Sequence, residues 1–163
     1  MEQIKSYTSI VLAVAIGILL QFILVWADEK DSPAKAAEHF AQAYYRLDPA
    51  MGKYLCEEIL AADDENVIER YILRMEAEAD ERGVRRHTMK SALYDIETFT
   101  RFIDDENAEV RITAGRKTSI NPVYARVAKL FFIGETYPVD EVLQAVKEDG
   151  RWKICGNPFA LTL

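Results

Sequence analysis

The sequence predicts an α+β protein in which an N-terminal transmembrane helix precedes a domain of three helices and four or five antiparallel strands. Two observations support this prediction. Residues 10–26 contain no charged side chain. After residue 90, the spacing of apolar residues changes from about four, typical of helices, to two, typical of strands. The 163 residues leave room for one domain of ordinary size.

The apolar segment at the N-terminus has the dimensions of a membrane-spanning helix. Tyr7 to Trp26 covers 20 residues, enough to cross a hydrocarbon core of about 30 Å, and both ends carry an amphipathic aromatic side chain. We therefore expect residues 1–27 to form a membrane anchor or uncleaved signal, which contacts the lipid bilayer through residues 8–26.

The charges on either side of this segment indicate its orientation. Lys5 lies on the short side and Asp28, Glu29 and Asp31 on the long side, which favours a cytoplasmic N-terminus. We expect a single-pass protein of the inner (plasma) membrane with a periplasmic or extracytoplasmic domain. The alternative is a signal peptide cleaved after Ala27, which also places the domain outside the cytoplasm.

Three residues of the apolar segment share one helical stripe. Ala13, Gly17 and Gln21 follow one another at intervals of four. Small residues at this spacing let a second helix approach closely, and an amide can hydrogen-bond across the contact. The stripe predicts packing against a helix of another subunit, and the alternative is the ordinary composition of a membrane helix.

Charge and composition exclude several classes of protein. The net charge is −7, and it belongs to the part beyond residue 27, which holds 26 acidic and 19 basic residues. An acidic domain of this kind is not expected to bind nucleic acid as its main partner. With 50% hydrophobic residues, the chain is also unlike disordered or collagen-like proteins.

The domain begins with three predicted helices after a polar linker at residues 28–32. Ser32 caps a helix that starts at Pro33, and Asp48-Pro49 repeats the same signal for a helix that extends to Leu60. Asp63 or Asp64 caps a third helix, which Gly83 ends. The apolar stripe of this third helix contains Val67, Ile68, Tyr71, Ile72 and Met75.

The second half of the domain reads as strands and turns. Alternating residues predict strands over 92–102 and 108–114, with a turn at residues 104–107 between them. Residues 127–133 are apolar on both faces and predict a central strand. A further strand over 139–147 is joined by Asp149-Gly150, a two-residue hairpin signal, to a last strand ending at Cys155.

This order resembles the nuclear transport factor two-like superfamily. Phe40-Ala41-Gln42-Ala43, Leu47-Asp48 and Tyr54-Leu55 are similar to its first two helices, and residues 146–154 (VKEDGRWKI) to its closing hairpin. The resemblance spans roughly residues 33 to 158, so we assign residues 33–163 to this domain. It implies a cone fold: a curved antiparallel sheet wrapped on helices, with a pocket at the open end. The superfamily contains isomerases, dehydratases and cyclases as well as non-catalytic periplasmic domains behind one membrane helix.

The pocket implied by the resemblance has four candidate lining residues, but no catalytic residue emerges. Asp95 alternates onto a face with charged neighbours, and Asp48 is explained as a helix cap. Gly115-Arg116-Lys117-Thr118 lacks the spacing of a phosphate-binding loop and lies in a strand pattern. We expect no enzyme activity. The candidate pocket residues are His39, Tyr44, Tyr45 and Tyr94.

Metal and cofactor sites are not expected, and the two cysteines admit two interpretations. The sequence has no HExxH, no second histidine at ligand spacing and no CxxC, so we predict no metal site and no cofactor. Cys56 and Cys155 could form a disulfide outside the cytoplasm, closing a loop of about 100 residues. The alternative is two separate buried thiols.

These observations favour a non-catalytic, membrane-anchored accessory or assembly subunit. Its partners would be integral membrane subunits of a larger complex, like the inner-membrane component of type IV secretion systems that the anchor and domain resemble. Two alternatives remain: a module that binds a small apolar ligand, and an anchored isomerase or dehydratase.

Overall fold

The structure is a computed structural model that describes residues 11–22, 31–61, 66–85, 88–118 and 136–161. The chain divides into two compact units, Met1–Asp31 and Ser32–Leu163. In the first unit, residues 11–22 are helical, and their large apolar side chains are 49–71% exposed. No helix within the described residues is both long and apolar enough to span a membrane. The predicted 20-residue span reaches beyond residues 11–22 at both ends.

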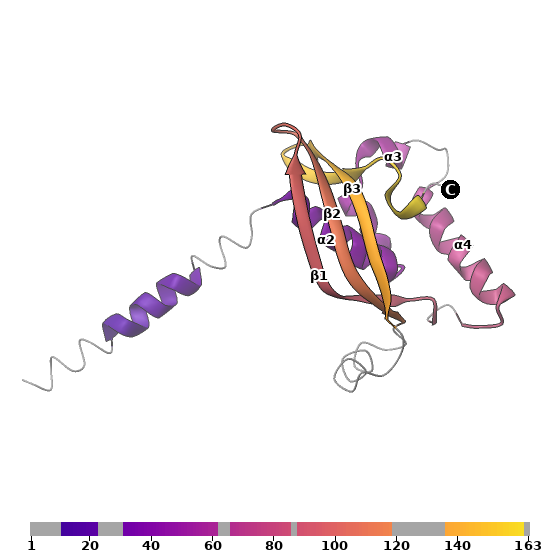
Figure 1. The fold of residues 1–163 in the computed structure, drawn as a ribbon, viewed down its shortest axis with the longest axis horizontal. Helices are drawn as coiled ribbons and strands as arrows, with labels where there is room; N and C mark the ends of the chain where they lie inside the picture. Colours follow the sequence, from indigo (N-terminus) through magenta and orange to yellow (C-terminus); the bar gives the residue numbers. More distant parts are fainter. Residues whose placement is uncertain (1–10, 23–30, 62–65, 86–87, 119–135, 162–163) are drawn as a thin grey trace, which may run out of the picture. The chain divides into compact units, whose positions relative to one another are not determined.

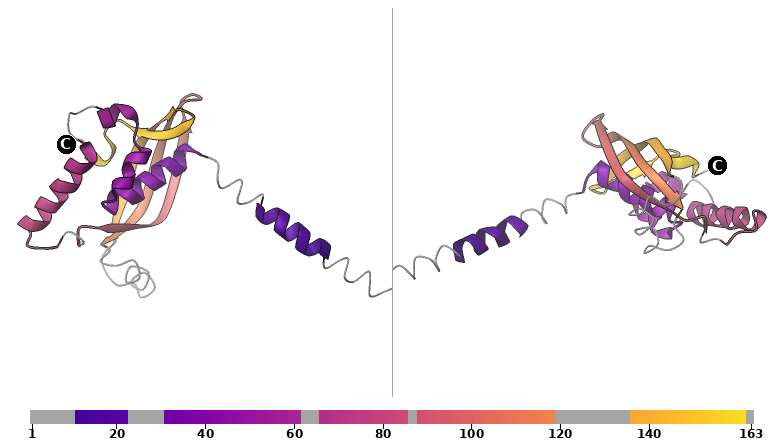
Figure 2. Two further views of the ribbon diagram at one scale, coloured as in Figure 1. Left: turned by 180° about the vertical axis from the view of Figure 1, so that it is seen from behind. Right: turned by 60° about the horizontal axis from the view of Figure 1, so that its bottom comes forward.

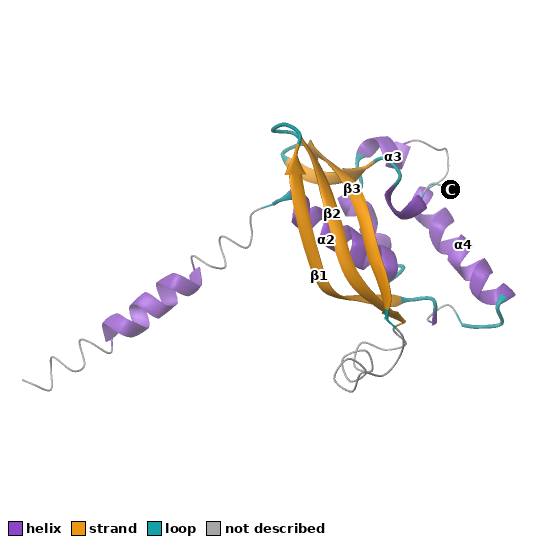
Figure 3. Cartoon of the chain, in the orientation of Figure 1, coloured by secondary structure: helices purple, strands orange, loops and turns teal. Residues whose placement is uncertain are grey.

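The second unit is α+β, as the sequence predicts, and its four described strands form one antiparallel sheet in the order β1-β2-β3-β4. In Figures 1 and 3, α2 lies across one face of this sheet, and α4 lies beside it near the C-terminus. The view from behind in Figure 2 (left) shows α2 in front of the sheet and α4 beside it. The elements are α2 (Pro33–Tyr45), the 3-10 helix η1 (Pro49–Tyr54), α3 (Glu57–Ala61), α4 (Val67–Glu81), β1 (Ser91–Phe102), β2 (Asn107–Thr118), β3 (Tyr137–Glu148), β4 (Arg151–Cys155) and η3 (Pro158–Ala160).

The first helix follows its predicted signals. The Ser32 Oγ accepts a hydrogen bond from the Lys35 backbone N–H at 3.2 Å, and Pro33 occupies the first turn. The buried face of α2 includes Ala37 and Phe40, both without solvent exposure. They pack in one core cluster with apolar residues of the sheet's inner face, among them Val110, Ile112, Leu143, Ala145 and Ile154.

The second predicted helix is interrupted. Asp48 caps as predicted, since its Oδ1 accepts from the Ala50 N–H at 2.9 Å, but it begins the 3-10 helix η1. Leu55 then pairs with Ile154 of β4, and the Cys56 N–H donates to the Ile154 carbonyl at 3.0 Å. This pairing with a distant strand takes over backbone groups that a continuous helix would use, so α3 starts separately.

The third helix ends where predicted but is capped by a different residue. The Asn66 Oδ1 accepts from the Ile68 N–H at 3.1 Å, so the cap is Asn66. Asp63 and Asp64, the predicted caps, lie outside the described residues. At the other end, Gly83 has φ +65°. The N–H groups of Gly83 and Val84 donate hydrogen bonds to the carbonyls of Asp80 and Ala79 in the last turn of the helix.

The predicted strands are present where the structure describes them, with one irregularity. The register of β1 against β2 shifts between Tyr94 and Glu97, and Asp95 has φ 51°. This β-bulge puts Leu93 and Ile96 on the core side together, whereas simple alternation assigned them to opposite faces. Glycine residues 115 and 150 lie in β2 and in the β3–β4 turn as expected. The predicted strand at 127–133 lies outside the described residues.

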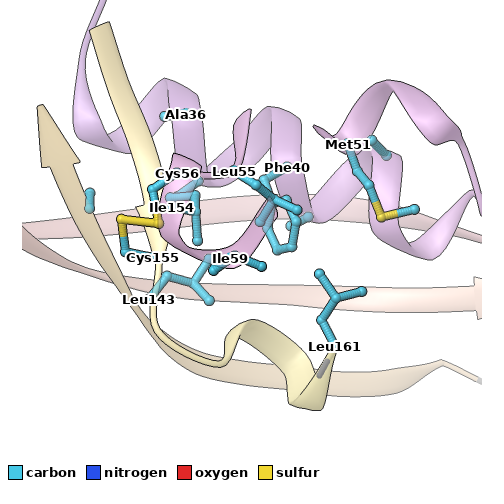
Figure 4. Close-up of a cluster of buried hydrophobic side chains, with 14 of the residues drawn as sticks. Ala36, Phe40, Met51, Leu55, Cys56, Ile59, Leu143, Ile154, Cys155 and Leu161 are labelled. Carbon is cyan, nitrogen blue, oxygen red and sulfur yellow. A yellow bond between two sulfur atoms is a disulfide. The ribbon is translucent and has the colours of Figure 1, made fainter. Parts of the chain in front are cut away.

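The two cysteines meet because η1 and β4 lie side by side. Figure 4 shows Cys56 and Cys155 joined by a disulfide beside Leu55 and Ile154. Leu55 and Ile154 form an isolated β-bridge, and the Cα atoms of the two cysteines are 5.3 Å apart. Cys56 is fully buried and Cys155 is 9% exposed. The disulfide closes a 99-residue stretch of chain at the edge of the core cluster.

Candidate functional site

A cleft of about 710 Å³ lies between the end of α2, the inner side of α4, one end of the sheet and the segment around η3. Its lining combines aromatic, thioether and charged side chains. The aromatic residues are Tyr44, Tyr45, Tyr71 and Phe159, and the charged residues are Glu78, Arg82, Arg116 and Glu141. The cleft therefore combines aromatic rings with charges of both signs.

The floor of the cleft is a cluster of stacked rings centred on Tyr44. Its ring centroid lies 4.6 Å from that of Tyr71 and 5.0 Å from that of Phe159, both nearly parallel. Tyr45 meets it edge-on at 5.2 Å. The Tyr44 hydroxyl also donates a hydrogen bond to the Phe159 carbonyl at 2.9 Å. Helix α2 thus presents two adjacent tyrosines. Tyr44 stacks on Tyr71 of α4 and on Phe159 of η3, and Tyr45 also contacts Phe159.

Burial keeps these tyrosines protonated. It raises the pKa of Tyr45 to about 12, and it also raises the pKa values of Tyr44 and Tyr71. At neutral pH the three hydroxyls are hydrogen-bond donors and not general bases. Tyr44 already donates its proton to the Phe159 carbonyl, and Tyr71 donates its proton to the Tyr44 carbonyl at 3.5 Å. Among the three, the Tyr45 hydroxyl is therefore the one that suits recognition of an acceptor atom on a bound molecule.

Three of the charged residues of the cleft contact neighbouring side chains. The Arg116 guanidinium lies 5.5 Å from the ring centroids of both Tyr45 and Tyr137, so it makes two cation–π contacts. Glu78 and Arg82 form an ion pair one turn apart on α4. The cleft contains two carboxylates, Glu78 and Glu141, and no histidine among its described lining residues.

Two residues at the cleft have an unusual backbone conformation. Leu47 (φ 53°) and Phe159 (φ 51°) both lie in the left-handed region that favours glycine. Leu47 ends α2, since its N–H donates to the Tyr44 carbonyl at 3.0 Å. Strained residues of this kind often mark binding sites, and here they shape two sides of one cleft.

The predicted pocket residues divide into two pairs. Tyr44 and Tyr45 line the cleft, whereas His39 and Tyr94 do not. His39 is exposed and stacks on Tyr54, with ring centroids 5.5 Å apart. Asp95, the rejected acid/base candidate, is exposed at the β-bulge. The sequence reasoning assigned no site role to Tyr71, Phe159 and Arg116, because only the tertiary fold brings these three segments together.

The described residues contain one further group with ligand-bearing side chains. Cys56, Glu148 and Cys155 each place one sulfur or carboxylate oxygen atom so that the three atoms lie within 4.8 Å of one another.

Ala13, Gly17 and Gln21 lie on the helix at residues 11–22, and a Cβ added to Gly17 would meet no described atom within 4 Å.

The fold and the cleft define an α+β domain with a cleft lined by aromatic and charged side chains. No protein-family model matches the chain, and no curated protein sequence is significantly similar to it.

Proposed function

We propose that this chain is a membrane-anchored, non-catalytic accessory or assembly subunit of a membrane protein complex, with its domain outside the cytoplasm. The observation that carries the proposal is the Cys56–Cys155 disulfide in a chain that also has an uncharged N-terminal segment. Disulfides persist in oxidising compartments, and an apolar segment of this length suits a bilayer. Two separate parts of the chain thus favour the same location.

The fold is compatible with the nuclear transport factor two-like resemblance. A four-stranded antiparallel sheet with α2 across one face and a closing β3–β4 hairpin supports it. The turn of that hairpin, Asp149-Gly150, has positive φ at both residues, as the predicted two-residue turn requires. We include membership of this superfamily in the proposal, together with the non-catalytic role that its anchored periplasmic members have.

Exposed apolar residues support contact with a partner subunit. Phe99 and Phe102 lie near the end of β1, Ile103 follows it, and the three are 71%, 62% and 62% exposed. Phe99 lies on the outer face of the sheet, whereas Phe102 pairs with the buried Ala108 and lies on the inner face, where its ring is 6.0 Å from that of Trp152. Val142, also exposed, lies on the same outer face as Phe99, with Arg111 between them in register. Exposed apolar side chains such as Phe99 and Val142 on one face of the sheet favour contact with a partner subunit.

The proposal is tested by purifying the full chain from native membranes in a gentle detergent. We expect it in the membrane fraction, with its domain digested by protease added from the outer side, and co-purifying with integral membrane subunits. Intact mass on the same sample shows whether Met1 is retained. Recovery of a lone monomer with no co-purifying protein would refute the proposal.

Variants then separate the two expected contact regions. Gly17→Leu should lower co-purification, because it adds bulk to the Ala13–Gln21 stripe at a position where an added Cβ meets no described atom within 4 Å. Ile18→Leu, next to it on another face, is the matched control. Phe99→Ser should lower co-purification through the domain and leave thermal stability unchanged, because the side chain is 71% exposed.

A second candidate function, a binding module for a small ligand, is favoured by the aromatic cleft. Stacked tyrosine and phenylalanine rings bind a flat molecule well, and the protonated hydroxyl of Tyr45 favours one that carries an acceptor atom. Native mass spectrometry of the purified chain tests this function. An extra bound mass that is lost in Tyr45→Phe supports it, and a chain of bare mass under all conditions counts against it.

An isomerase or dehydratase activity is the least supported alternative. It needs an acid/base group in the cleft, where the carboxylates are Glu78, paired with Arg82, and Glu141. If turnover of a carbonyl compound were found, Glu141→Gln should abolish it.

A further inference from the structure

The disulfide lies in a group of three potential metal ligands. Cys56 follows η1, and Cys155 ends β4, 99 residues later. Glu148 lies at the end of β3, and its carboxylate oxygen and both sulfur atoms lie within 4.8 Å of one another. Two distant parts of the sequence, residue 56 and the β3–β4 hairpin, therefore converge on one small volume.

The backbone around this group is fixed by hydrogen bonds. The Cys56 N–H donates to the Ile154 carbonyl at 3.0 Å, which holds the two cysteine-bearing segments together. The Glu148 Oε2 accepts from the Glu57 backbone N–H at 3.1 Å. This bond orients the carboxylate and leaves its other oxygen available. The three ligand positions thus do not depend on the sulfur–sulfur bond alone.

We propose that Cys56, Cys155 and Glu148 form a zinc site when the two cysteines are reduced. Every chain is synthesised with two thiols, so the dithiol state exists before the disulfide closes. It returns when a thiol reductant acts: the disulfide and two molecules of reductant thiol give two protein thiols and one reductant disulfide. Binding of Zn²⁺ then forms two zinc–sulfur bonds and releases the two thiol protons.

The chemistry of the three ligands selects zinc. Two thiolates and one carboxylate are ligands that Zn²⁺ accepts at about 2.3 Å and about 2.0–2.2 Å, whereas Mg²⁺ and Ca²⁺ require oxygen ligands. In a tetrahedral site the two sulfur atoms would stand roughly 3.8 Å apart. The Cα–Cα distance of 5.3 Å lets side-chain rotation supply this separation.

The site would have three protein ligands and one position for water. Cys56 is fully buried and Cys155 nearly so, but Glu148 is only half-buried and lies toward solvent. The open position is therefore on the side of Glu148. The sequence predicted no metal site, because it contains no ligands at close spacing along the chain. Here the ligands are close only in the folded domain.

The test uses the full chain, purified in detergent under reductant. Co²⁺ serves as the spectroscopic probe, and Zn²⁺ alone is used in competition. We expect one Co²⁺ per reduced chain with a thiolate charge-transfer band, displacement by Zn²⁺, and release of two protons per metal ion. The oxidised chain should show none of these signals.

Glu148→Gln is the decisive variant, because it keeps an acceptor oxygen for the Glu57 N–H and removes the charge. It should weaken Zn²⁺ binding by about tenfold or more, since even outer-shell partners of a metal contribute about 10–100-fold. Glu58→Gln, an exposed acid on α3, is the matched control and should bind as the wild type does.

Three results would overturn the proposal. The first is a folded, reduced wild type that binds no Co²⁺ or Zn²⁺ at micromolar concentration. The second is a Glu148→Gln variant with unchanged affinity. The third is a reduced chain that is unfolded by circular dichroism and does not recover its fold when Zn²⁺ is added.

Discussion

Removal of the Cys56–Cys155 disulfide should strongly destabilise the domain. The perturbation is the double variant Cys56→Ala/Cys155→Ala, which avoids placing a hydroxyl in the fully buried position of Cys56. Its effect arises in the unfolded state, because the cross-link restricts the chain between residues 56 and 155.

The magnitude follows from the length of the closed loop. A separation of 99 residues corresponds to a loop-closure entropy worth about 4.7 kcal/mol at 25 °C. Native disulfides of small domains contribute about 2–5 kcal/mol when measured, so we expect a loss of roughly 4 kcal/mol. For a domain of this size, each kcal/mol moves the melting temperature by about 3–5 °C, which predicts a decrease of roughly 12–20 °C.

The assay is urea denaturation followed by circular dichroism and tryptophan fluorescence, with a metal chelator in all samples so that zinc cannot replace the cross-link. The reduced wild type serves as the control and should unfold within about 1 kcal/mol of the double variant, because both lack the cross-link. An oxidised wild type that is less than about 1 kcal/mol more stable than the variant would refute the loop-closure reasoning.

Three further predictions concern single features. Tyr44→Phe removes the hydrogen bond to the Phe159 carbonyl and should lower the free energy of unfolding, measured by urea denaturation, by about 1–2 kcal/mol. The control Tyr54→Phe, outside the cleft, should lower it clearly less. Equal losses in the two variants would contradict this prediction. The free energy of unfolding should fall as the pH rises from 10 to about 12, because the unfolded chain loses its tyrosine protons near pH 10 while folded Tyr45 retains its proton until about pH 12. Tyrosinate absorbance and melting temperature, measured together, check this prediction. A constant melting temperature over that range would contradict it. Gly83→Ala should cost about 1 kcal/mol because φ is +65°, although a Cβ would meet no atom within 4 Å, and a melting temperature equal to that of the wild type would show that the helix end adapts.

Local signals predicted the positions of most elements. Ser32 and Asp48 cap with their own side chains, and Gly83 and Asp149-Gly150 adopt positive φ where the sequence places a stop and a turn. In each case, the residue type determines the backbone geometry within three or four positions. Such features need no knowledge of the rest of the fold, so the sequence suffices.

Features that depend on contacts between distant segments were not predictable. The break between η1 and α3 exists because Leu55 pairs with Ile154, about 100 residues away. The bulge at Asp95 is set by the register of β1 against β2. The alternation of β1 therefore assigned Leu93 to the outer face, although it packs on the core.

The candidate site was predicted only in part, for the same reason. Tyr44 and Tyr45 could be found because they extend an apolar stripe of one helix with polar hydroxyl groups. Tyr71 has the same character in its own helix, but nothing local indicates that it stacks on Tyr44. Arg116 lies in a strand, as predicted, but its contacts with the rings of Tyr45 and Tyr137 form only when the helix and the strands come together in the folded domain.

The two left-handed residues at the cleft show what maintains its shape. A left-handed conformation costs about 1–2 kcal/mol for a residue with a Cβ, and Phe159 adopts one where glycine would be cheaper. Its ring contacts three others, Phe40, Tyr44 and Tyr45, and each aromatic pair contributes about 0.5–1.5 kcal/mol. Together with the hydrogen bond from Tyr44, worth about 1 kcal/mol, these contacts exceed the backbone cost. The wall of the cleft is therefore held by side-chain stacking against the preference of the backbone. A ligand must bind on the exposed side of this stack, because separating Tyr44 from Phe159 would give up the contacts that keep Phe159 in place.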